Sequence, residues 1–294
     1  PFEPRMVVME SGRIIYDGQG GDKETRGQGD KETGKRGDKE TRIQGDGETV
    51  VEVTDLHVGY NGGSVLHGLS LEIGQGEFVA VMGDNGSGKT TFLQSLLGLL
   101  KPDQRRVEVL GQDTRHTPIS QLARQVGFLF QNPDHQLFAE SIWKEATFAL
   151  RNFDALNELS RTRTKELLTH CGLQDRGRDH PYRLSYGEKR RLNLISALAH
   201  APRLILLDEV LIGQDARNAT FLMELLRERA EQGGTVVMVN HNPEITRRYA
   251  SRLIFFNSGQ AIVDAPTGEA FRQLDALGRR AYLPRERRRG QITL

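Results

Sequence analysis

The sequence is poor in cysteine and in long apolar runs. Its 294 residues contain one cysteine, Cys171, so an internal disulfide framework is excluded and a reducing compartment is favoured. Cys171 lies in an expected helical stretch, where a packed, inert thiol is the simpler interpretation than a nucleophile. The longest apolar run, at 204–207, is stopped by two acidic residues and is far too short to cross a bilayer.

A net charge of one sign is also lacking. The 40 lysines and arginines are balanced by 39 acidic residues, so no global field attracts nucleic acid or an anionic surface. The length allows one large domain or two small ones. The chain starts Pro-Phe-Glu-Pro-Arg, which is neither a signal peptide nor a natural start, and this favours a fragment or a misplaced start.

Residues 19–48 lack almost every apolar side chain. The unit Gly-Asp-Lys-Glu-Thr occurs three times, at Gly21–Thr25, Gly29–Thr33 and Gly37–Thr41, with a period of eight. Such a segment is too polar to bury a core, so we predict a flexible linker. A solvated charged helix is the alternative, but regularly spaced glycines disfavour it.

Two segments far apart in the chain align without a gap. Residues 5–18 (RMVVMESGRIIYDG) and 252–265 (RLIFFNSGQAIVDA) both begin with arginine, carry Ser-Gly at the same offset, and place Asp17 and Asp264 in register. Each predicts a β-hairpin. Coincidence between two generic hairpins is one explanation. We favour the other, in which residues 1–18 are the last hairpin of a preceding domain of the same type as the one at 49–275.

From residue 49 the chain has the texture of an α/β domain. Short β-branched or leucine-rich runs at 51–58, 78–82, 203–207 and 235–240 predict strands, and 90–100 and 189–200 predict helices. Strands that alternate with helices favour a mainly parallel sheet. Residues 276–294 are polar and arginine-rich, so we expect a solvated basic tail, with contact to anionic lipid as the alternative.

The most specific motif is a glycine-rich loop between an apolar strand and a helix. It matches G-x-x-x-x-G-K-[ST], in which backbone N–H groups surround phosphate oxygens, the lysine reaches the β- and γ-phosphates, and the hydroxyl binds Mg²⁺. A simple glycine-rich turn is the alternative, which the Lys-Thr pair disfavours. The predicted nucleotide ligands here are Gly83, Asp84, Asn85, Gly86, Ser87, Gly88, Lys89, Thr90 and Thr91.

A second motif is the run Leu204–Leu207 followed by Asp208 and Glu209. A buried strand that ends in two carboxylates places them at the sheet edge where ligands of α/β proteins bind. We predict that Asp208 holds Mg²⁺, with Thr90, and that Glu209 orients or deprotonates the attacking water. A strand that ends in solvated acids would look similar.

A third motif, Leu-Ser-Tyr-Gly-Glu at 184–188, precedes a helix. Ser185 and Glu188 have the spacing of a capping box, which is a structural role. A small polar residue and Gly187 before a helix also make a second phosphate-binding helix end. The two roles are compatible.

The order of the phosphate loop, Gln131, 184–188, 204–209, Asp215 and His241 resembles the ATP-binding-cassette (ABC) nucleotide-binding domain over residues 49–275. The resemblance implies a P-loop NTPase fold with a mainly parallel RecA-like core, an antiparallel β subdomain and an α-helical signature subdomain. It also implies ATP and Mg²⁺ as ligands. Two cassettes of this family enclose two ATP molecules head to tail.

The resemblance assigns further roles. Ser185, Gly187 and Glu188 would serve an ATP that the partner cassette's phosphate loop holds. Gln131 would contact Mg²⁺ or water as well as the membrane partner, and His241 would contact the γ-phosphate.

Tyr60 precedes the phosphate loop at the distance of the family's adenine-stacking aromatic. A tyrosine that packs at the end of a strand is the alternative for this residue.

The stretch 131–138 (QNPDHQLF) resembles that of energy-coupling-factor ATPases, which drive uptake of vitamins and of cobalt or nickel. The sequence departs from many members at Tyr186 and Glu188, and at 210–214, before Asp215. These departures put the local geometry around Asp215 in doubt.

The sequence therefore predicts an ATPase that energises a transporter from the cytoplasmic face of a membrane. Its expected partners are a second cassette and an integral membrane subunit, with Phe138 and Trp143 as candidate contacts, although Trp143 is as easily a core residue. No nucleic acid is expected. The alternatives are a soluble tandem-cassette ATPase acting on ribosomes or nucleic acid, and an ATP-binding regulatory module that does not hydrolyse ATP.

Overall fold

The computed structural model describes residues 7–10, 13–17, 48–60, 63–102 and 106–285. The chain separates into two compact units, Pro1–Gly47 and Glu48–Leu294, each of which is described by itself. The predicted linker at 19–48 lies outside the described residues except for Glu48.

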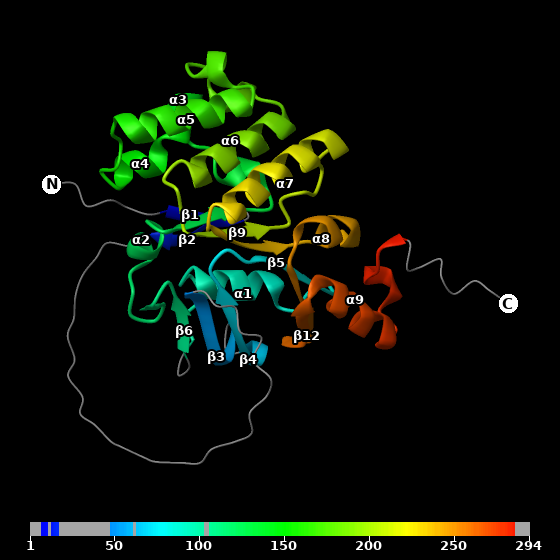
Figure 1. Ribbon diagram of the computed structural model, residues 1–294. Coiled ribbons are helices and arrows are strands. Elements are labelled where there is room, and N and C mark those ends of the chain that lie inside the picture. The colour runs from blue at the N-terminus through cyan, green and yellow to red at the C-terminus, as the bar shows by residue number, and fades with distance from the viewer. Residues whose placement is uncertain (1–6, 11–12, 18–47, 61–62, 103–105, 286–294) are drawn as a thin grey trace, which may run out of the picture. The chain divides into compact units, whose positions relative to one another are not determined.

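The second unit is built on a six-stranded sheet (Figure 1). All neighbouring strands are parallel except the pair β11 and β12, which is antiparallel. Every residue of β9 and β10 is buried, which is why these strands are continuous apolar runs rather than alternating ones. The strand order is β12 (Gln260–Pro266), β11 (Arg252–Asn257), β5 (Phe78–Gly83), β10 (Thr235–Val239), β9 (Leu204–Asp208) and β8 (Val126–Leu129).

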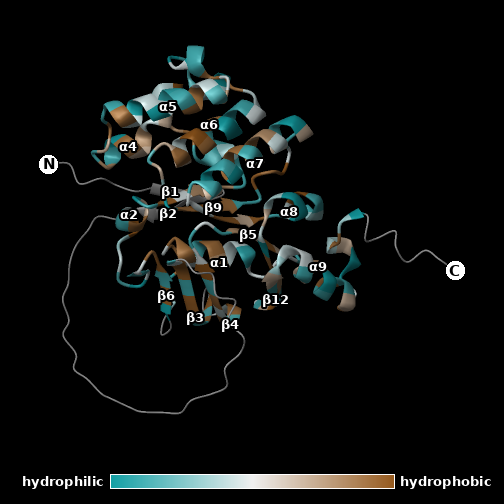
Figure 2. Ribbon diagram, in the orientation of Figure 1, coloured by the Kyte–Doolittle hydropathy of each residue, from teal (hydrophilic) through white to brown (hydrophobic). Residues whose placement is uncertain are grey.

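A smaller antiparallel sheet covers one side of this core. Its order is β4 (Gly63–Gly74), β3 (Thr49–Tyr60), β6 (Arg106–Val109) and β7 (Gln112–Asp113). Helix α1 (Lys89–Leu96) lies between the two sheets (Figure 1) and contributes Phe92, Leu93 and Leu96 to their shared core. Figure 2 shows the strands as the most hydrophobic part of this unit.

Helices cover the opposite face of the large sheet. Leu222, Met223 and Leu226 of α7 (Ala216–Glu231) pack on it together with α9 (Thr267–Ala276). A separate hydrophobic cluster, which includes Ile142 and Leu192, forms the core of the helical region drawn at the top of Figure 1. That region contains α3 (Ile142–Ala146), α4 (Phe148–Asn152), α5 (Glu158–His170) and α6 (Tyr186–Leu198), with the 3₁₀ turns Pro133–His135, Gln174–Arg176 and Pro181–Arg183. The short helices α2 (Ile119–Leu122) and α8 (Pro243–Tyr249) complete the unit.

The predicted α/β class, with its parallel core, antiparallel β region and helical region, is confirmed. The helix predicted at 90–100 ends at Leu96, because Gly98 adopts a positive φ of 69° just beyond it. The helix predicted from residue 189 begins earlier, at Tyr186, where Ser185 caps it.

The residues after α9 differ from the solvated tail that the sequence indicated. Leu283 is 1% exposed and belongs to the core cluster under α9, and a 3₁₀ turn, Arg280–Tyr282, precedes it. Residues 277–285 therefore pack on the domain rather than leave it at residue 276. The arginine-rich residues 286–294 lie outside the described part.

The first unit contains the hairpin that the sequence predicts, formed by β1 (Val7–Glu10) and β2 (Arg13–Asp17). Its register repeats that of β11 and β12 at an offset of 247 residues (252 − 5): Val7 pairs with Asp17, as Ile254 pairs with Asp264. Both hairpins also carry a register shift at the same place, between Val8 and Met9 and between Phe255 and Phe256. The gapless sequence alignment thus extends to a shared irregularity of pairing.

Candidate nucleotide-binding site

The loop after β5 has a backbone that only glycine fits at two points. Gly83 has φ 147°, and a Cβ there would lie 2.2 Å from the carbonyl oxygen of Phe256. Gly88 has φ 102°, and a Cβ there would lie 2.5 Å from Leu66 Cδ2. The loop can therefore wind tightly between the strand and α1, with N–H groups free to face an anion.

Lys89 lies inside this loop. Its side chain is buried and its ammonium donates to the backbone oxygens of Gly83 (3.0 Å) and Asp84 (2.8 Å). Burial lowers the pKa of Lys89, and the charges of Glu209 and Asp208 oppose that shift. A buried cation whose hydrogen bonds go to neutral carbonyl groups can exchange them for phosphate oxygens.

The other predicted residues of the loop differ in exposure. Asn85 and Gly86 are exposed, whereas Ser87 and Thr91 are buried in the loop and in the first turn of α1. The hydroxyl of Ser87 has no hydrogen-bond partner among the described residues. A buried, unpaired hydroxyl in a phosphate-type loop is expected where a ligand completes the hydrogen bonding.

Asp208 ends β9 close to the start of α1. The Thr90 hydroxyl lies 3.4 Å from Asp208 Oδ1, so two oxygen donors converge there. In the described part of the chain no three acidic, histidine or cysteine side chains gather into a metal cluster. One carboxylate and one hydroxyl fit Mg²⁺, which binds through few protein oxygens together with phosphates and water.

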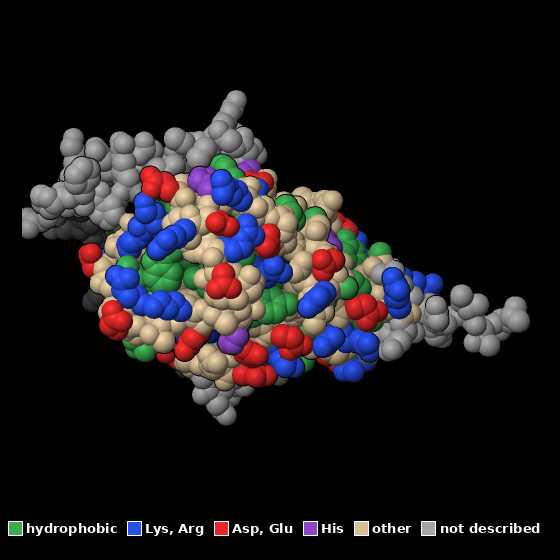
Figure 3. All heavy atoms as spheres, turned by 90° about the horizontal axis from the view of Figure 1, so that it is seen from above, with side chains coloured by type: hydrophobic (Ala, Val, Ile, Leu, Met, Phe, Trp, Pro, Cys, Tyr) green, Lys and Arg blue, Asp and Glu red, His purple; other side chains and the backbone are tan. Residues whose placement is uncertain are grey.

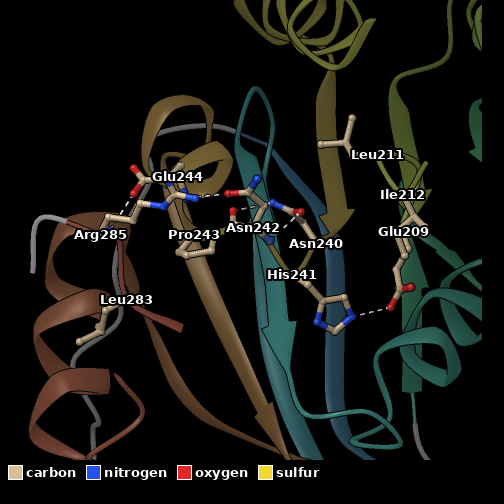
Figure 4. A pocket seen from close by; sticks show the side chains of 10 residues that line it. All are labelled: Glu209, Leu211, Ile212, Asn240, His241, Asn242, Pro243, Glu244, Leu283 and Arg285. Carbon is tan, nitrogen blue, oxygen red and sulfur yellow. Dashed lines mark hydrogen bonds and ion pairs between the residues drawn. The ribbon is translucent and has the colours of Figure 1, made fainter. Parts of the chain in front are cut away.

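Glu209 receives hydrogen bonds from two directions. His241 Nε2 lies 2.6 Å from Oε1, and Gln131 Nε2 donates to Oε2 at 3.0 Å. Pairing of Val239 with Asp208 in β10 and β9 sets the histidine beside the glutamate, as Figure 4 shows. The backbone φ of Glu209 is 49°, a region that L-residues rarely adopt and that is often found at functional sites.

Gln131 is positioned by a residue that the sequence analysis missed. Arg190, fully buried in α6, donates to the backbone oxygen of Phe130 at 2.5 Å and to that of Gln131. Burial lowers the pKa of Arg190. The sequence places Arg190 in the helix after the signature motif but does not reveal that its side chain turns inward to a residue 60 positions away.

The signature residues begin α6. Ser185 and Glu188 form the predicted capping box: the Ser185 hydroxyl accepts from the Glu188 N–H, and Glu188 Oε2 accepts from the Ser185 N–H at 2.8 Å. Glu188 is also paired with Arg176 at 2.9 Å. A Cβ on Gly187 would lie 2.8 Å from the side-chain amide nitrogen of Asn218 in α7, so a larger residue here would require that side chain to shift.

Asp215 and Tyr60 also have defined environments. Asp215 caps α7 by accepting from the Asn218 N–H at 2.8 Å. Tyr60, at the end of β3, is 47% exposed, and its hydroxyl donates to Gln94 of α1. An exposed ring tethered beside the phosphate loop is available for stacking, so the proposed contact with adenine stays a prediction.

A cavity of about 610 Å³ adjoins the Glu209–His241 pair (Figure 4). Its walls come from the ends of β9 and β10, from Pro243 and Glu244 of α8, and from Leu283 and Arg285. No residue of the phosphate loop lines this cavity, so it is a compartment next to the proposed phosphate site rather than the site itself.

The two candidate contacts with a membrane subunit, Phe138 and Trp143, differ in exposure. Phe138 is 62% exposed and its ring lies edge-on to Phe148, whereas Trp143 packs against the helical cluster, as its core alternative requires.

Cys171 is buried, and burial raises its pKa to about 12, which fits an inert thiol. Among the described residues, none of the helices combines the length and apolar character that a bilayer crossing requires.

Comparison with known proteins identifies the type of site. Residues 66–211 match the family described as ABC transporter. A protein of Caldanaerobacter subterraneus named "Putative ABC transporter ATP-binding protein" is 34% identical over 78% of this chain and 40% of its own length. A protein of Methanosarcina mazei with the same name is 39% identical over 78% of this chain and 39% of its own. The chain spans about two fifths of the length of these curated relatives.

Solved structures agree. A structure described as cbiO1 of Clostridium perfringens, part of the ABC transporter complex cbiONQ, is 28% identical with a TM-score of 0.68, over 80% of this chain and 98% of that one. An ATP-binding cassette in a dimeric post-hydrolysis state with ADP and Pi is 28% identical with a TM-score of 0.65, over 74% and 98%. The predicted enzyme class, an ATPase of this family, is confirmed at the level of the domain.

Proposed function

This chain carries an ABC transporter ATPase domain, and we propose that the protein binds and hydrolyses Mg·ATP to power a membrane transporter. The observation that carries the proposal is the Glu209 carboxylate, held between His241 (2.6 Å) and Gln131 (3.0 Å) at the sheet edge that also bears Asp208 and the Lys89 loop. The groups that we assign to phosphate binding, Mg²⁺ binding and activation of water within one chain lie on this one edge.

In the proposed mechanism, loop N–H groups and Lys89 hold the β- and γ-phosphates of ATP and offset their charge. Thr90 and Asp208 would hold Mg²⁺, which would neutralise the developing phosphate charge. Glu209 accepts a proton from the attacking water or orients it, and His241 fixes that carboxylate through their short hydrogen bond. Loss of this pair would leave ATP bound but water misplaced.

Replacement of Glu209 by glutamine tests this proposal. We expect the variant to keep its affinity for ATP and to lose about 100- to 10,000-fold in turnover, because general-base catalysis contributes that much. Glu231→Gln, at the exposed C-terminal end of α7, is the matched control and should turn over as the wild type does. Near-normal hydrolysis by Glu209→Gln would remove Glu209 from the mechanism.

We infer that two cassettes complete each ATP site. The helix end at Ser185 and Gly187 belongs to the same chain as the phosphate loop, but the family arrangement pairs it with the partner's ATP. A structurally similar cassette that is dimeric with ADP and Pi supports this arrangement. A total rate of ATP hydrolysis that rises with the square of protein concentration at low concentration, while ATP binding per chain stays constant, is the expected signature.

We infer further that the natural protein holds both cassettes in tandem. The β1–β2 hairpin repeats the register of β11–β12, including its irregularity, and the curated relatives are more than twice as long as the matched segment. A phosphate loop and signature motif in the reading frame upstream of Pro1 would support the idea. Unrelated sequence there would end it.

The transported material that we favour is a vitamin or a transition-metal ion, in the manner of energy-coupling-factor uptake. The support is the stretch 131–138 together with the structural likeness to cbiO1. Phe138, the exposed last residue of that stretch, is the proposed contact with the membrane subunit at the cytoplasmic face. Co-purification with integral membrane proteins is the expected result, and Phe138→Ser should weaken it without changing ATP binding.

The soluble alternative, an ATPase acting on ribosomes or nucleic acid, has less support. Figure 3 shows that positive and negative side chains are interspersed over much of the face it views, and no basic stripe runs along the length of that face. Binding through phosphates needs such a stripe. Co-sedimentation with ribosomes would favour this alternative over the transporter.

A further inference from the structure

The phosphate loop carries an acidic side chain, and residues from the far end of the chain hold it. Arg279 Nη1 donates to Asp84 Oδ2 at 3.0 Å, and the Tyr282 hydroxyl donates to Oδ1 at 2.5 Å. Both residues follow α9, about 195 positions after Asp84. We call residues 277–285 the C-terminal clasp.

The clasp is fixed independently of Asp84. The Tyr282 ring stands edge-on to Phe255 with centroids 4.7 Å apart, and Arg279 Nη2 donates to Asn257 Oδ1 at 2.9 Å. Leu283 is buried, and the Arg285 N–H donates to Glu244 at 2.7 Å. The clasp thus approaches Asp84 from residues that pack on β11 and α8, and its last residues form the cavity wall across from His241 (Figure 4).

The position of Asp84 makes its charge consequential. Its backbone oxygen accepts from the Lys89 ammonium at 2.8 Å. Burial lowers the pKa of Lys89, whereas the charge of Asp84, with those of Glu209 and Asp208, acts in the opposite sense. A carboxylate whose field reaches Lys89 also reaches the phosphates that Lys89 binds, and it repels them.

We propose that Arg279 and Tyr282 are positioning residues for the nucleotide: they hold the Asp84 carboxylate and offset its charge, so that the affinity for ATP depends on the C-terminal clasp. The inference rests on the proposed ATP binding at this loop. It assigns a ligand-binding consequence to residues that neither touch the nucleotide nor belong to any of its motifs. Movement of the clasp would thereby change nucleotide affinity from outside the site.

A double-mutant cycle tests the inference, with Mg·ATP binding measured by calorimetry on the full chain. Arg279→Ala is expected to raise the Kd for ATP about fivefold, because the pair is partly exposed and such pairs contribute up to about 1 kcal/mol. Arg279→Lys should recover most of the affinity. Arg272→Ala, which breaks a surface pair with Glu269 on α9, is the matched control and should leave the Kd unchanged.

The decisive arm adds Arg279→Ala to Asp84→Asn. With no carboxylate charge to offset, the second change should leave the Kd of the Asp84→Asn protein unaltered. The fivefold loss should also shrink between about 0.05 M and about 0.5 M salt, since screening weakens charge repulsion but not packing. Tyr282→Phe, which keeps the ring on Phe255, should show a smaller loss of the same kind.

Each outcome has a distinct meaning. Arg279→Ala could weaken ATP binding equally in the wild type and in the Asp84→Asn protein, and independently of salt. That result would show that the clasp acts only through packing, and it would overturn the inference. The proposed function would still stand if the wild type binds ATP. A wild-type chain that binds no ATP would overturn the proposed function and, with it, the inference.

Discussion

The two helix ends that carry the expected ATP motifs, that of α1 and that of α6, are prepared for phosphate in different ways. Helix α1 starts after Gly88 in the left-handed region, and no described side chain caps its first turn. Helix α6 starts at Ser185 with a complete capping box, in which Glu188 places a carboxylate over the first N–H groups. The α1 end offers its N–H donors without a side-chain cap, whereas at the α6 end the capping box already occupies the N–H groups of Ser185 and Glu188.

This difference indicates which of the two helix N-termini can bind nucleotide in a single chain. A helix N-terminus attracts anions through unpaired N–H groups and its positive dipole. At α1 both are available, and Lys89 adds a buried cation. At α6 the charge of Glu188 already complements the dipole and is itself paired with Arg176, so an incoming phosphate meets a carboxylate of its own sign beside the Ser185 hydroxyl. We therefore expect primary binding at α1 and a later, closure-dependent contact at α6.

The largest expected effect on ATP binding comes from Lys89→Ala. Removal of the buried ammonium leaves two loop carbonyl groups without their donor and the β- and γ-phosphates without their cation. Two charge-assisted hydrogen bonds of about 1.5 kcal/mol each predict a Kd for ATP raised about 100-fold. Equilibrium binding on the single chain measures it, with Lys101→Ala as the surface control. An unchanged Kd would contradict primary binding at α1.

Ser185→Ala sharpens the other side of the comparison. Binding of ATP to the single chain should match that of the wild type, whereas turnover of the assembled cassette pair should fall about 30-fold, the effect of one hydrogen bond to a charged phosphate. Loss of the cap should also lower the free energy of unfolding by about 1 kcal/mol. Urea unfolding measures the loss of stability separately from the loss of turnover. Asp215→Ala, which removes a comparable cap from α7, shows how large a loss of stability the removal of one cap causes. A loss of single-chain binding by Ser185→Ala would erase the distinction between the ends.

Asp208→Asn probes the metal at the α1 end, with an intermediate effect. The wild type should bind ATP more tightly with Mg²⁺ than with a chelator, and the variant should lose about tenfold of that advantage, because one carboxylate ligand becomes a neutral amide. Binding in the presence of chelator should change little. An equal loss with and without Mg²⁺ would show that Asp208 acts on Thr90 and the loop rather than through a metal.

The sequence motifs predicted the phosphate loop and the start of α1 more fully than the distant residues that hold Gln131 and Asp84 in place. A phosphate loop is local: glycines, Lys89 and Thr90 lie within eight residues, so their spacing alone indicates the chemistry. The hydrogen bonds to Glu209 join three strand ends, and parallel pairing in β8, β9 and β10 accounts for them once the strands are recognised. Arg190 and Tyr282 could not be predicted, because their roles depend on tertiary contacts at separations of about 60 and 198 residues.

The smallest expected effect concerns how the far end of α6 is anchored. His200 follows this helix, lies edge-on to Phe153, and has its pKa lowered by burial to about 4. Since the unfolded chain takes up a proton near pH 6.5 and the folded chain only near pH 4, the stability present above pH 6.5 is lost as the pH falls.

Between pH 7 and pH 5.5 this loss amounts to about 1 kcal/mol of unfolding free energy. In His200→Leu the acid-dependent loss should shrink by that amount, as measured by urea unfolding at the two pH values. The same acid shift should leave single-chain ATP binding at α1 untouched, because His200 lies at the end of α6 remote from Ser185. If acid weakened ATP binding at α1 through His200, the two helix ends would be coupled within one chain rather than across the cassette pair.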